Sequence, residues 1–371
     1  MKIAIANNTS HYAWMFRSNL ITKLIENGHV VTVIAPFDSY ANKIEALSAK
    51  YVHLSMKMNK NPFSDLLLVA KFHNILKRED IEIYLGYTIK PNIYGSLAAQ
   101  ALGIPTINNI TGLGATFIKN GLITRLVKFL YRMALKRSAK VFFQNNDDLS
   151  LFINENIIFH KRYDLLPGSG IDLVKYTPLF GHNNGGSLNI KFLLVARMLW
   201  DKGIGEYVNA ARILKAKNKH LIFLLLGPLD VQNPAAISRE KVLEWQNEGI
   251  IKYLGVSEDT RKEISMADCV VLPSYREGTS RALLEAAAMG KPIITTNAVG
   301  CKEVVDHEIN GFLCNVRDSE DLADKMLRMA EISPAQRDQM GINSRKKVEI
   351  QFDEDIVLNK YMNDIAAVTI D

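Results

Sequence analysis

Two carboxylates beside the start of a short predicted helix are the residues best placed to do chemistry. Glu277 and Glu285 stand eight residues apart in the stretch 270–303, which reads VVLPSYREGTSRALLEAAAMGKPIITTNAVGCKE. We expect a helix over 279–289, with Glu277 just ahead of it and Glu285 about two turns into it. The free backbone N–H groups of a helix's first turn bind anions. Two acids flanking such a turn suit a ligand that carries both phosphate and hydroxyl groups, as a nucleotide-sugar does.

An E-x7-E pair occurs by chance in many soluble helices, so its surroundings decide its meaning. This pair follows a predicted buried strand at 269–273 and precedes another at 293–296. Ligands of open α/β sheets bind at such strand-to-helix junctions. The helix is otherwise small and apolar, which makes Glu285 the one acid on a segment that looks buried. A buried carboxylate without a partner is costly, and this favours a functional role.

Two cations follow the first predicted strand of the second half. Arg197 ends the apolar strand expected at 190–196, and Lys202 stands five residues further on in a short loop. Surface charges are usually solvated, and Lys202 has Asp201 and Glu206 nearby as alternative partners. A charge at the end of an apolar strand is nevertheless hard to bury alone. We therefore expect both cations to face the same crevice as the two acids.

Strands and helices alternate along both halves of the chain. In the first half we expect strands at 2–7, 29–35, 81–85, 106–110 and 140–144, and helices at 14–27, 63–78, 92–102 and 123–137. In the second half we expect strands at 190–196, 221–227, 251–255, 269–273 and 293–296, and helices at 204–217, 279–289 and 353–367. This alternation predicts an α/β protein with a doubly wound parallel sheet in each half. A chain of 371 residues also suits two domains.

Composition points to a protein of the reducing cytoplasm. The three cysteines form no C-x-x-C pair and are odd in number, which argues against disulfides and structural zinc. The first residues enter a strand directly, so we expect no signal peptide, and no run approaches the ~20 apolar residues of a membrane span. The net charge of +6 is modest and no nucleic-acid motif is present. We expect no nucleic-acid partner.

The stretch 270–303 resembles the donor-site signature of glycosyltransferase family 4, a retaining family with the GT-B architecture, and the likeness covers nearly the whole chain. The resemblance implies two Rossmann-like, doubly wound domains that face a central cleft. It implies an acceptor-binding domain at 1–166, a linker at 167–187, a nucleotide-sugar domain at 188–350, and a final helix at 351–371 that crosses back to the first domain. Within the family the chain is most similar to bacterial enzymes that extend polyprenyl-diphosphate-linked saccharides, N-acetylgalactosaminyltransferases among them.

The resemblance also implies roles for the donor-site residues. Arg197 and Lys202 would grip the donor diphosphate and stabilise the leaving nucleotide. Glu277 would lie near the donor sugar, and Glu285 would accept hydrogen bonds from the ribose hydroxyls. Further donor contacts are expected at Gly278, Thr279, Ser280 and Val256.

We expect no metal cofactor. The one literal D-x-D, at 353–355, stands at the start of the terminal helix, where acids are favoured for capping and dipole reasons. With two cations and a helix terminus available, metal-independent catalysis is the better interpretation.

Loops at strand ends of the first half supply the acceptor-side candidates. These are Asn109 near the end of the strand at 106–110, Thr111, Gly112 and Gly114 after it, Lys90 in the loop 88–92, and Arg17 in the first helix. The Gly-x-Gly at 112–114 can equally be an ordinary turn without a binding role. Many family members carry a glycine pair in the first loop and a histidine near the later one, and this chain has neither. No catalytic histidine is therefore assigned; His11 is a weak alternative that we expect to be a loop residue.

Residues 117–140 contain no acid and are rich in bases. The bases are Lys119, Arg125, Lys128, Arg132, Lys136, Arg137 and Lys140. One interpretation is an ordinary helix with a solvated basic face. The other is a membrane-surface helix around Arg125–Lys140, since roughly 1 kcal/mol per base is gained near an anionic leaflet. The second would make the protein peripheral on the inner face of the cell membrane.

These expectations combine into one function and its rivals. We expect retaining, metal-independent transfer of a hexose or N-acetylhexosamine from a UDP-sugar to a polyprenyl-diphosphate-linked saccharide, in bacterial surface polysaccharide or glycan assembly. The alternative is a UDP-sugar epimerase of similar two-domain fold. A NAD-dependent dehydrogenase is disfavoured because the first strand leads into Asn7-Asn8-Thr9-Ser10 and not a G-x-G-x-x-G loop. A non-catalytic binding protein would bind the donor without releasing nucleotide.

Overall fold

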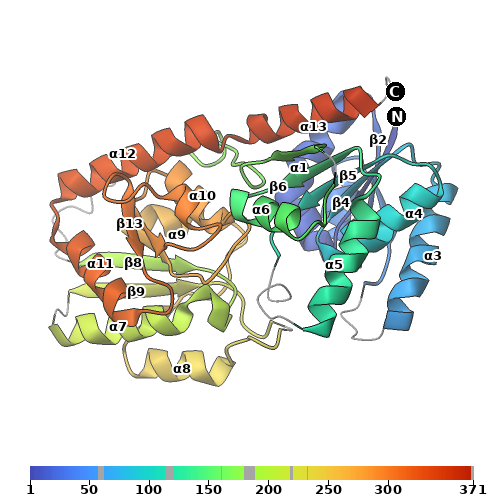
Figure 1. The fold of residues 1–371 in the computed structure, drawn as a ribbon. Coiled ribbons are helices and arrows are strands. Elements are labelled where there is room, and N and C mark those ends of the chain that lie inside the picture. The colour runs from blue at the N-terminus through green and yellow to red at the C-terminus, as the bar shows by residue number, and fades with distance from the viewer. Residues whose placement is uncertain are drawn as a thin grey trace. The chain divides into compact units, whose positions relative to one another are not determined.

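The chain forms two compact units (Figure 1). The computed structural model describes residues 1–56, 62–113, 121–159, 161–178, 189–217, 220–231 and 233–368. The first unit comprises Met1–Ser169 and Asp355–Asp371, and the second comprises Gly170–Glu354.

Among the described residues, the first unit holds a seven-stranded parallel sheet in the order β3-β2-β1-β4-β5-β6-β7. Its strands are β1 (Lys2–Ala6), β2 (Val30–Ala35), β3 (Lys50–His53), β4 (Ile83–Tyr87), β5 (Thr106–Ile110), β6 (Lys140–Phe143) and β7 (Tyr163–Leu165). Its helices are α1 (Ser10–Glu26), α2 (Ala41–Glu45), α3 (Pro62–Arg78), the π-helix η1 (Pro91–Gly95), α4 (Ser96–Ala101), α5 (Leu122–Leu135), α6 (Asn146–Asn154) and, from Asp355 on, α13 (Glu354–Val368).

The second unit has a six-stranded parallel sheet within the described residues, in the order β10-β9-β8-β11-β12-β13. Its strands are β8 (Ile190–Val195), β9 (Leu221–Leu226), β10 (Lys252–Tyr253), β11 (Cys269–Leu272), β12 (Ile293–Thr296) and β13 (Gly311–Cys314). Its helices are the 3-10 turns η3 (Trp200–Lys202) and η4 (Lys302–Val304), and α7 (Ile204–Lys217), α8 (Arg239–Asn247), α9 (Arg261–Met266), α10 (Arg281–Ala288), α11 (Ser319–Glu331) and α12 (Pro334–Gln351).

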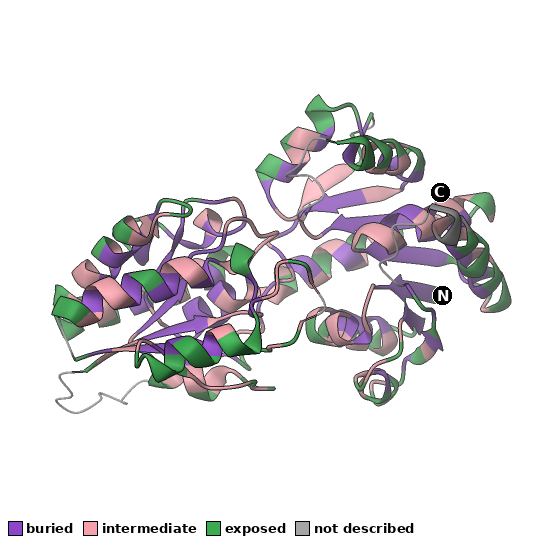
Figure 2. Cartoon of the chain, turned by 90° about the horizontal axis from the view of Figure 1, so that it is seen from below, coloured by how far each residue is buried: buried purple, intermediate pink, exposed green. Residues whose placement is uncertain are grey.

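These sheets confirm the predicted pair of doubly wound α/β halves. Strands such as β9, which reads LIFLLL, are apolar throughout because helices cover both faces of a parallel sheet. Figure 2 shows the strands mostly in the buried colour and the outer faces of the helices in the exposed colour. The predicted helix at 204–217 and the predicted strands at 106–110 and 293–296 have the observed bounds.

The first helix begins earlier than predicted. Thr9 caps α1, its side-chain oxygen accepting a hydrogen bond from the Tyr12 backbone N–H at 3.0 Å. This cap starts the helix at Ser10 and not at Trp14. His11 therefore lies in its first turn, where the ring stacks on Tyr40 at 4.5 Å between centroids, and the expectation of a loop histidine was wrong.

Part of the predicted linker at 167–187 packs within the second unit. The Ile171 N–H donates to the Phe352 carbonyl at 2.8 Å, and Arg345 donates to the Tyr176 carbonyl at 2.7 Å. Residues 170–178 therefore belong to the second unit, whereas 167–169 belong to the first. The part of the predicted linker from 179 on lies outside the described residues.

Strand order places a switch point in each sheet. In the first unit β1 lies between β2 and β4, and in the second unit β8 lies between β9 and β11. Chain connections leave these paired strands in opposite directions, which opens a crevice at their carboxyl ends where ligands of such sheets bind. The β1/β4 and β8/β11 junctions are therefore the two places to examine for a site.

Candidate functional site

An ion pair spans the β8/β11 switch point. The Lys202 ammonium lies 2.5 Å from a carboxylate oxygen of Glu277. Lys202 ends the short turn η3 after β8, and Glu277 lies in the turn after β11. Their side chains are only 14% and 16% exposed, so the pair is largely withdrawn from water. Lys202 therefore pairs with Glu277 and not with Asp201 or Glu206, the partners considered from the sequence.

Close backbone packing holds the turn after β8 against the turn after β11. Gly203 has φ +71°, and a Cβ there would lie 2.0 Å from the Pro273 carbonyl oxygen, so the site accepts only glycine. The Tyr275 N–H donates to the Asp201 carbonyl at 2.9 Å, and the Tyr275 hydroxyl donates to Glu206 at 2.7 Å. The position of Lys202 relative to the Glu277 turn is thus fixed by main-chain contacts.

The loop after β12 supports the Glu277 turn from the other side. The Glu277 N–H donates to the Val299 carbonyl at 2.8 Å, and the Ser280 N–H donates to the Gly300 carbonyl at 3.0 Å. Gly300 has φ +80°, and a Cβ there would lie 2.4 Å from the Glu277 carbonyl carbon. Three neighbouring strands, β8, β11 and β12, therefore fix one polar turn at the carboxyl edge of the sheet.

Arg197 supplies a second cation at this edge. It stands two residues after Val195, the last residue of β8, and is half-buried. Among the described residues it has no ion-pair or hydrogen-bond partner. Lys202 is already paired, so Arg197 is the cation that a bound anion could engage without breaking an existing contact.

The N-terminus of α10 faces the same edge because the helix starts directly after the Glu277 turn. Ser280 is its N-cap residue, but the side chain makes no capping hydrogen bond. The first N–H groups of a helix have no intrahelical partner, and they carry a partial positive charge. Gly278 and Thr279, both half-buried, connect Glu277 to this helix start.

Glu285 is buried and has three hydrogen-bond donors. One carboxylate oxygen accepts from the Tyr176 hydroxyl at 2.9 Å and from Arg281 at 3.1 Å. The other accepts from the Thr260 hydroxyl at 2.9 Å. These contacts account for the burial of Glu285, so its burial alone does not require a ligand, contrary to the expectation from the sequence. A ribose would have to share or displace them.

These three partners of Glu285 were not predicted from the sequence. Arg281 stands four residues before Glu285, and that i,i+4 spacing was the available signal. Tyr176 lies 109 residues away and carried no such signal. Burial raises the pKa of Tyr176, and the adjacent Glu285 charge raises it further, which keeps the hydroxyl a donor. Val256 is two-thirds exposed just after β10, four residues before Thr260.

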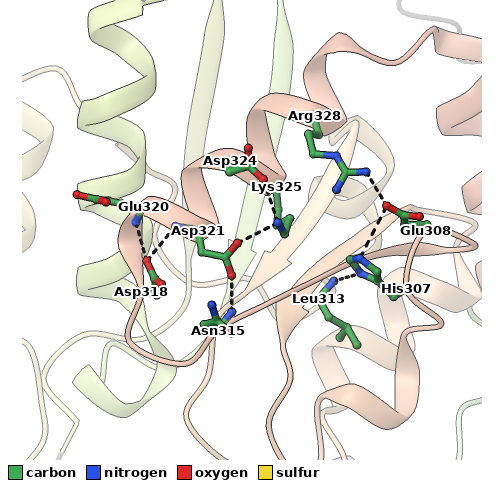
Figure 3. Close-up of polar contacts among 10 residues, drawn as sticks. All are labelled: His307, Glu308, Leu313, Asn315, Asp318, Glu320, Asp321, Asp324, Lys325 and Arg328. Carbon is green, nitrogen blue, oxygen red and sulfur yellow. Dashed lines mark hydrogen bonds and ion pairs between the residues drawn. The ribbon is translucent and has the colours of Figure 1, made fainter.

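The acid-rich turn after β13 is structural (Figure 3). Asp318 caps α11 by accepting from the Glu320 and Asp321 N–H groups. Asp321 accepts from the Asn315 N–H at 2.7 Å and pairs with Lys325 at 2.9 Å. Because β12 separates β13 from β11, this network lies at the edge of the sheet away from the switch point.

In the first unit, β5 sends consecutive asparagines to opposite faces of the sheet. Asn109 donates to the Tyr361 hydroxyl of α13 at 2.9 Å. Asn108 donates to Asn92 at 2.9 Å and to Ser96 at 2.7 Å. These bonds fix the strand end from which Thr111 and Gly112 continue, both half-buried, while Gly114 lies outside the described residues.

Lys90 and Arg17 differ in their surroundings. Lys90 is paired with Asp65 at 2.6 Å, with side chains 16% and 18% exposed. Arg17 is 4% exposed, and its guanidinium lies 4.1 Å from the ring centroid of Tyr87, the last residue of β4. Tyr87 and Tyr361 have ring centroids 6.2 Å apart. The structure thus brings Arg17 into one cluster with Asn109 and leaves Lys90 in an ion pair.

The basic stretch is shorter as a helix than predicted. α5 ends at Leu135, and Lys140 begins β6, where it lies 3.6 Å from Asp364. Lys128 pairs with Glu155 at 2.9 Å, and Arg132 donates to the Asn156 and Glu155 carbonyls. Residues 117–120, including Lys119, lie outside the described residues. Three of the predicted bases are therefore committed to contacts within the first unit.

The outward face of α5 is apolar. Side chains at positions 122, 126, 129 and 133 follow one helical stripe. They are Leu122, Leu126, Phe129 and Met133, exposed by 82%, 48%, 53% and 44%. Tyr131 and Leu135 on the opposite side are buried. Arg125, Lys136 and Arg137 are exposed beside the apolar stripe.

Among the described helices, none is both long enough and apolar enough to span a bilayer. Nor do the described His, Cys, Asp and Glu side chains form a group of three placed to hold a metal ion.

Comparison with known proteins identifies the family. A family model described as "Glycosyl transferases group 1" matches residues 189–331, and one described as "Glycosyl transferase 4-like" matches residues 2–145. The two matches fall on the second and first units respectively. The chain belongs to glycosyltransferase family 4. The enzyme is thus a glycosyltransferase, and the epimerase, dehydrogenase and binding-protein alternatives are not supported.

One relative of this family-4 enzyme covers nearly all of its length, and another covers about three quarters of it. It is 29% identical over 380 residues to N,N'-diacetylbacillosaminyl-diphospho-undecaprenol alpha-1,3-N-acetylgalactosaminyltransferase of Campylobacter jejuni, covering 98% of this chain and 97% of that one. It is 25% identical over 286 residues to UDP-Gal:alpha-D-GlcNAc-diphosphoundecaprenol alpha-1,3-galactosyltransferase of Escherichia coli, covering 74% and 72%. Its fold matches that of Anabaena HepE in complex with UDP and glucose, with a TM-score of 0.79, 18% identity and 99% coverage of both chains. The predicted GT-B fold is confirmed.

Proposed function

We propose that this enzyme transfers a hexose or N-acetylhexosamine, with retention of anomeric configuration, from a UDP-sugar to a saccharide on polyprenyl diphosphate. The observation that carries the donor assignment is the β8/β11 edge, where Lys202 pairs with Glu277 and α10 begins directly after the Glu277 turn, with Arg197 at the end of β8 as a further cation. Cations and helix amides suit a diphosphate. The names of the Campylobacter and Escherichia relatives, which both include an undecaprenyl-diphosphate sugar, support the acceptor.

The proposed chemistry needs no dedicated base. The bond from the sugar C1 to the β-phosphate oxygen breaks while the acceptor hydroxyl oxygen bonds to C1 from the same face. The departing phosphate oxygen takes the acceptor proton. Arg197 and Lys202 stabilise the negative charge that develops on the leaving UDP. We propose that these two cations replace a metal ion, and that Glu277 contacts the donor sugar while Glu285 holds the ribose.

Calorimetric titration tests the donor site. UDP in EDTA should bind the wild-type protein more tightly than GDP or ADP does. Arg197→Gln should weaken UDP binding about 10- to 100-fold because a charge-assisted phosphate contact is lost. Arg212→Gln is the matched control, since Arg212 is a partly exposed arginine of α7 paired with Glu248. Equal effects of the two changes, or binding that needs a divalent metal, would contradict the donor assignment.

We also propose that α5 holds the enzyme on the inner leaflet of the cell membrane. The outward stripe Leu122, Leu126, Phe129 and Met133 would enter the interface, and Arg125, Lys136 and Arg137 would meet anionic headgroups. β5 precedes α5, so the N-terminal end of the helix lies at the carboxyl edge of the sheet, on the side of the acceptor loop.

Liposome sedimentation tests this surface. Wild-type protein should bind vesicles containing anionic lipid and dissociate as salt rises. Phe129→Glu should abolish binding without changing the melting temperature, whereas Leu243→Glu, at an exposed leucine of α8 in the second unit, should leave it intact. Binding that is indifferent to salt, lipid charge and Phe129 would refute the proposal.

A further inference from the structure

Arg17 is a buried cation without a counter-charge. It is 4% exposed, and its Nε atom has no hydrogen-bond partner. Among the described residues no carboxylate lies within ion-pair distance of it. The acids of nearby loops are otherwise engaged: Asp38 accepts from the His11 and Tyr40 N–H groups, and Asp65 pairs with Lys90. A buried charge without a partner is costly unless a bound ligand supplies the opposite charge.

Arg17 lies at the switch point of the first sheet. It lies on α1, the helix that follows β1, and it stacks on Tyr87 at the carboxyl end of β4. Its contact therefore spans the β1/β4 switch point, as the Lys202–Glu277 pair spans the β8/β11 switch point of the second unit. Thr88, the residue after Tyr87, has φ +64°, an uncommon conformation for a β-branched residue.

A second polar atom in this cluster also lacks a partner. Asn109, fully buried, is the register neighbour of Tyr87 on β5, and its Oδ1 accepts no hydrogen bond. Its amide group donates to Tyr361. Burial raises the pKa of both Tyr87 and Tyr361, and the Arg17 charge opposes the rise in each, which places the guanidinium close to both phenols.

We propose that Arg17 binds the phosphate group of the acceptor substrate, with the Asn109 side-chain oxygen accepting a hydrogen bond from a hydroxyl of the adjoining sugar. The inference rests on the proposed function. One face of the guanidinium lies on Tyr87, so its N–H edge is left to form a bidentate contact with an oxyanion. Residues 8–9 and 88–90, which follow β1 and β4, are half-buried, so these segments beside the cluster are partly accessible to solvent.

Acceptor kinetics separate this role from a structural one. We would measure the KM of a short prenyl-diphosphate sugar and the inhibition constant of the phosphate-free alkyl glycoside of the same sugar. Arg17→Gln should raise the KM about 10- to 100-fold, and Arg17→Lys should raise it less because it keeps the charge and loses the planar fork. The glycoside inhibition constant and the UDP affinity should stay within about twofold.

The matched control is Lys43→Gln. Lys43 is another cation of the first unit that lies over aromatic rings, 4.6 Å from Tyr40 and 4.9 Å from Trp14, and it is not part of the cluster. It should leave the acceptor KM unchanged. If Arg17→Gln fails to fold, Arg17→Lys carries the same comparison.

Three results would overturn the proposal. An unchanged acceptor KM would show that Arg17 does not bind the acceptor. Parallel losses for the diphosphate acceptor and the glycoside would show a structural role. Wild-type protein that transfers to no lipid-linked acceptor, although it binds UDP, would contradict the proposed function itself and withdraw the phosphate assignment with it.

Discussion

The Lys202 ammonium lies 2.5 Å from the Glu277 carboxylate, across the switch point of the second sheet. Both side chains are mostly buried, and each neutralises the charge of the other. Under the proposed function, a donor diphosphate competes with Glu277 for Lys202. Glu277 then becomes available to the donor sugar when the phosphates bind.

Glu277→Gln and Lys202→Met should therefore change UDP affinity in opposite directions. Removing the Glu277 charge frees Lys202, so UDP, which has no sugar, should bind up to about tenfold more tightly. Removing the Lys202 charge should weaken UDP about 10- to 100-fold. Calorimetry measures both. Transfer should fall at least about 100-fold in each variant, and a Glu277→Gln protein that binds UDP as weakly as Lys202→Met would contradict the competition.

Glu285 should be needed for stability as well as for the donor. Glu285→Ala leaves Arg281 without its carboxylate and two hydroxyls, of Tyr176 and Thr260, without an acceptor. We expect a loss of about 3 kcal/mol or more in the free energy of unfolding. Urea denaturation measures it.

Two companion variants interpret that result. Glu285→Ala combined with Arg281→Met should recover part of the stability but none of the UDP affinity, because the unpaired charge is gone while the proposed ribose acceptor is still missing. Glu349→Ala is the control, since Arg345–Glu349 is another i,i+4 pair but half-exposed on the glutamate side, and it should cost below about 0.5 kcal/mol. Full activity in Glu285→Ala would refute the ribose role.

The Asp321 network predicts a defined loss of stability in acid (Figure 3). Burial alone would raise the pKa of Asp321, but the Lys325 ion pair and the Asn315 N–H together lower it. A carboxyl group whose pKa is lower in the folded protein than in the unfolded chain stabilises the fold. This stabilisation is complete at pH values above the unfolded pKa of about 3.9. That contribution is lost as the pH falls through the folded pKa.

Melting temperatures of Asp321→Asn across pH 2.5 to 7 check this sign. The variant should melt below wild type at pH 7, by the equivalent of about 1–2 kcal/mol, and the difference should shrink below about pH 4. Glu320→Gln, on the same helix turn but without such an ion pair, should show no such convergence. A difference that grows in acid would contradict the assignment.

The bases of α5 should separate into two groups. Arg132 donates to the carbonyls of Asn156 and Glu155, so Arg132→Gln should lower stability by about 1 kcal/mol and leave liposome binding unchanged. Arg125 and Lys136 are exposed, so changing both to Gln should weaken binding to anionic vesicles without lowering the melting temperature. The reverse pattern would show that the total charge of the segment matters and its outward face does not.

Features that depend on residues close together in the sequence could be predicted from it. The strand-helix alternation and the positions of Arg197, Lys202 and Glu277 at strand ends are local features. The handedness of parallel crossovers limits the possible strand orders but does not fix them, and the observed orders come from the structure. Two parallel sheets could therefore be inferred from patterning alone.

The partners of buried polar groups could not be predicted in the same way. Tyr176 and Glu285 are 109 residues apart, and Asn109 and Tyr361 are 252 apart. Neither pair has a periodic or compositional signal, because only the folded chain brings the partners together. For the same reason the partner of Lys202 was not predicted. It was expected among the neighbouring residues of the chain, but it stands 75 residues away.

The most direct test of the proposed transfer is release of UDP from UDP-GalNAc, UDP-GlcNAc, UDP-Gal and UDP-Glc in EDTA, with and without a short polyprenyl-diphosphate sugar. The anomeric configuration of the product would be read by NMR. We predict release that requires the acceptor, a strong preference for one donor, and a product that keeps the donor's anomeric configuration. Release without acceptor, conversion of the donor to its epimer, an inverted product or no release from any UDP-sugar would contradict it.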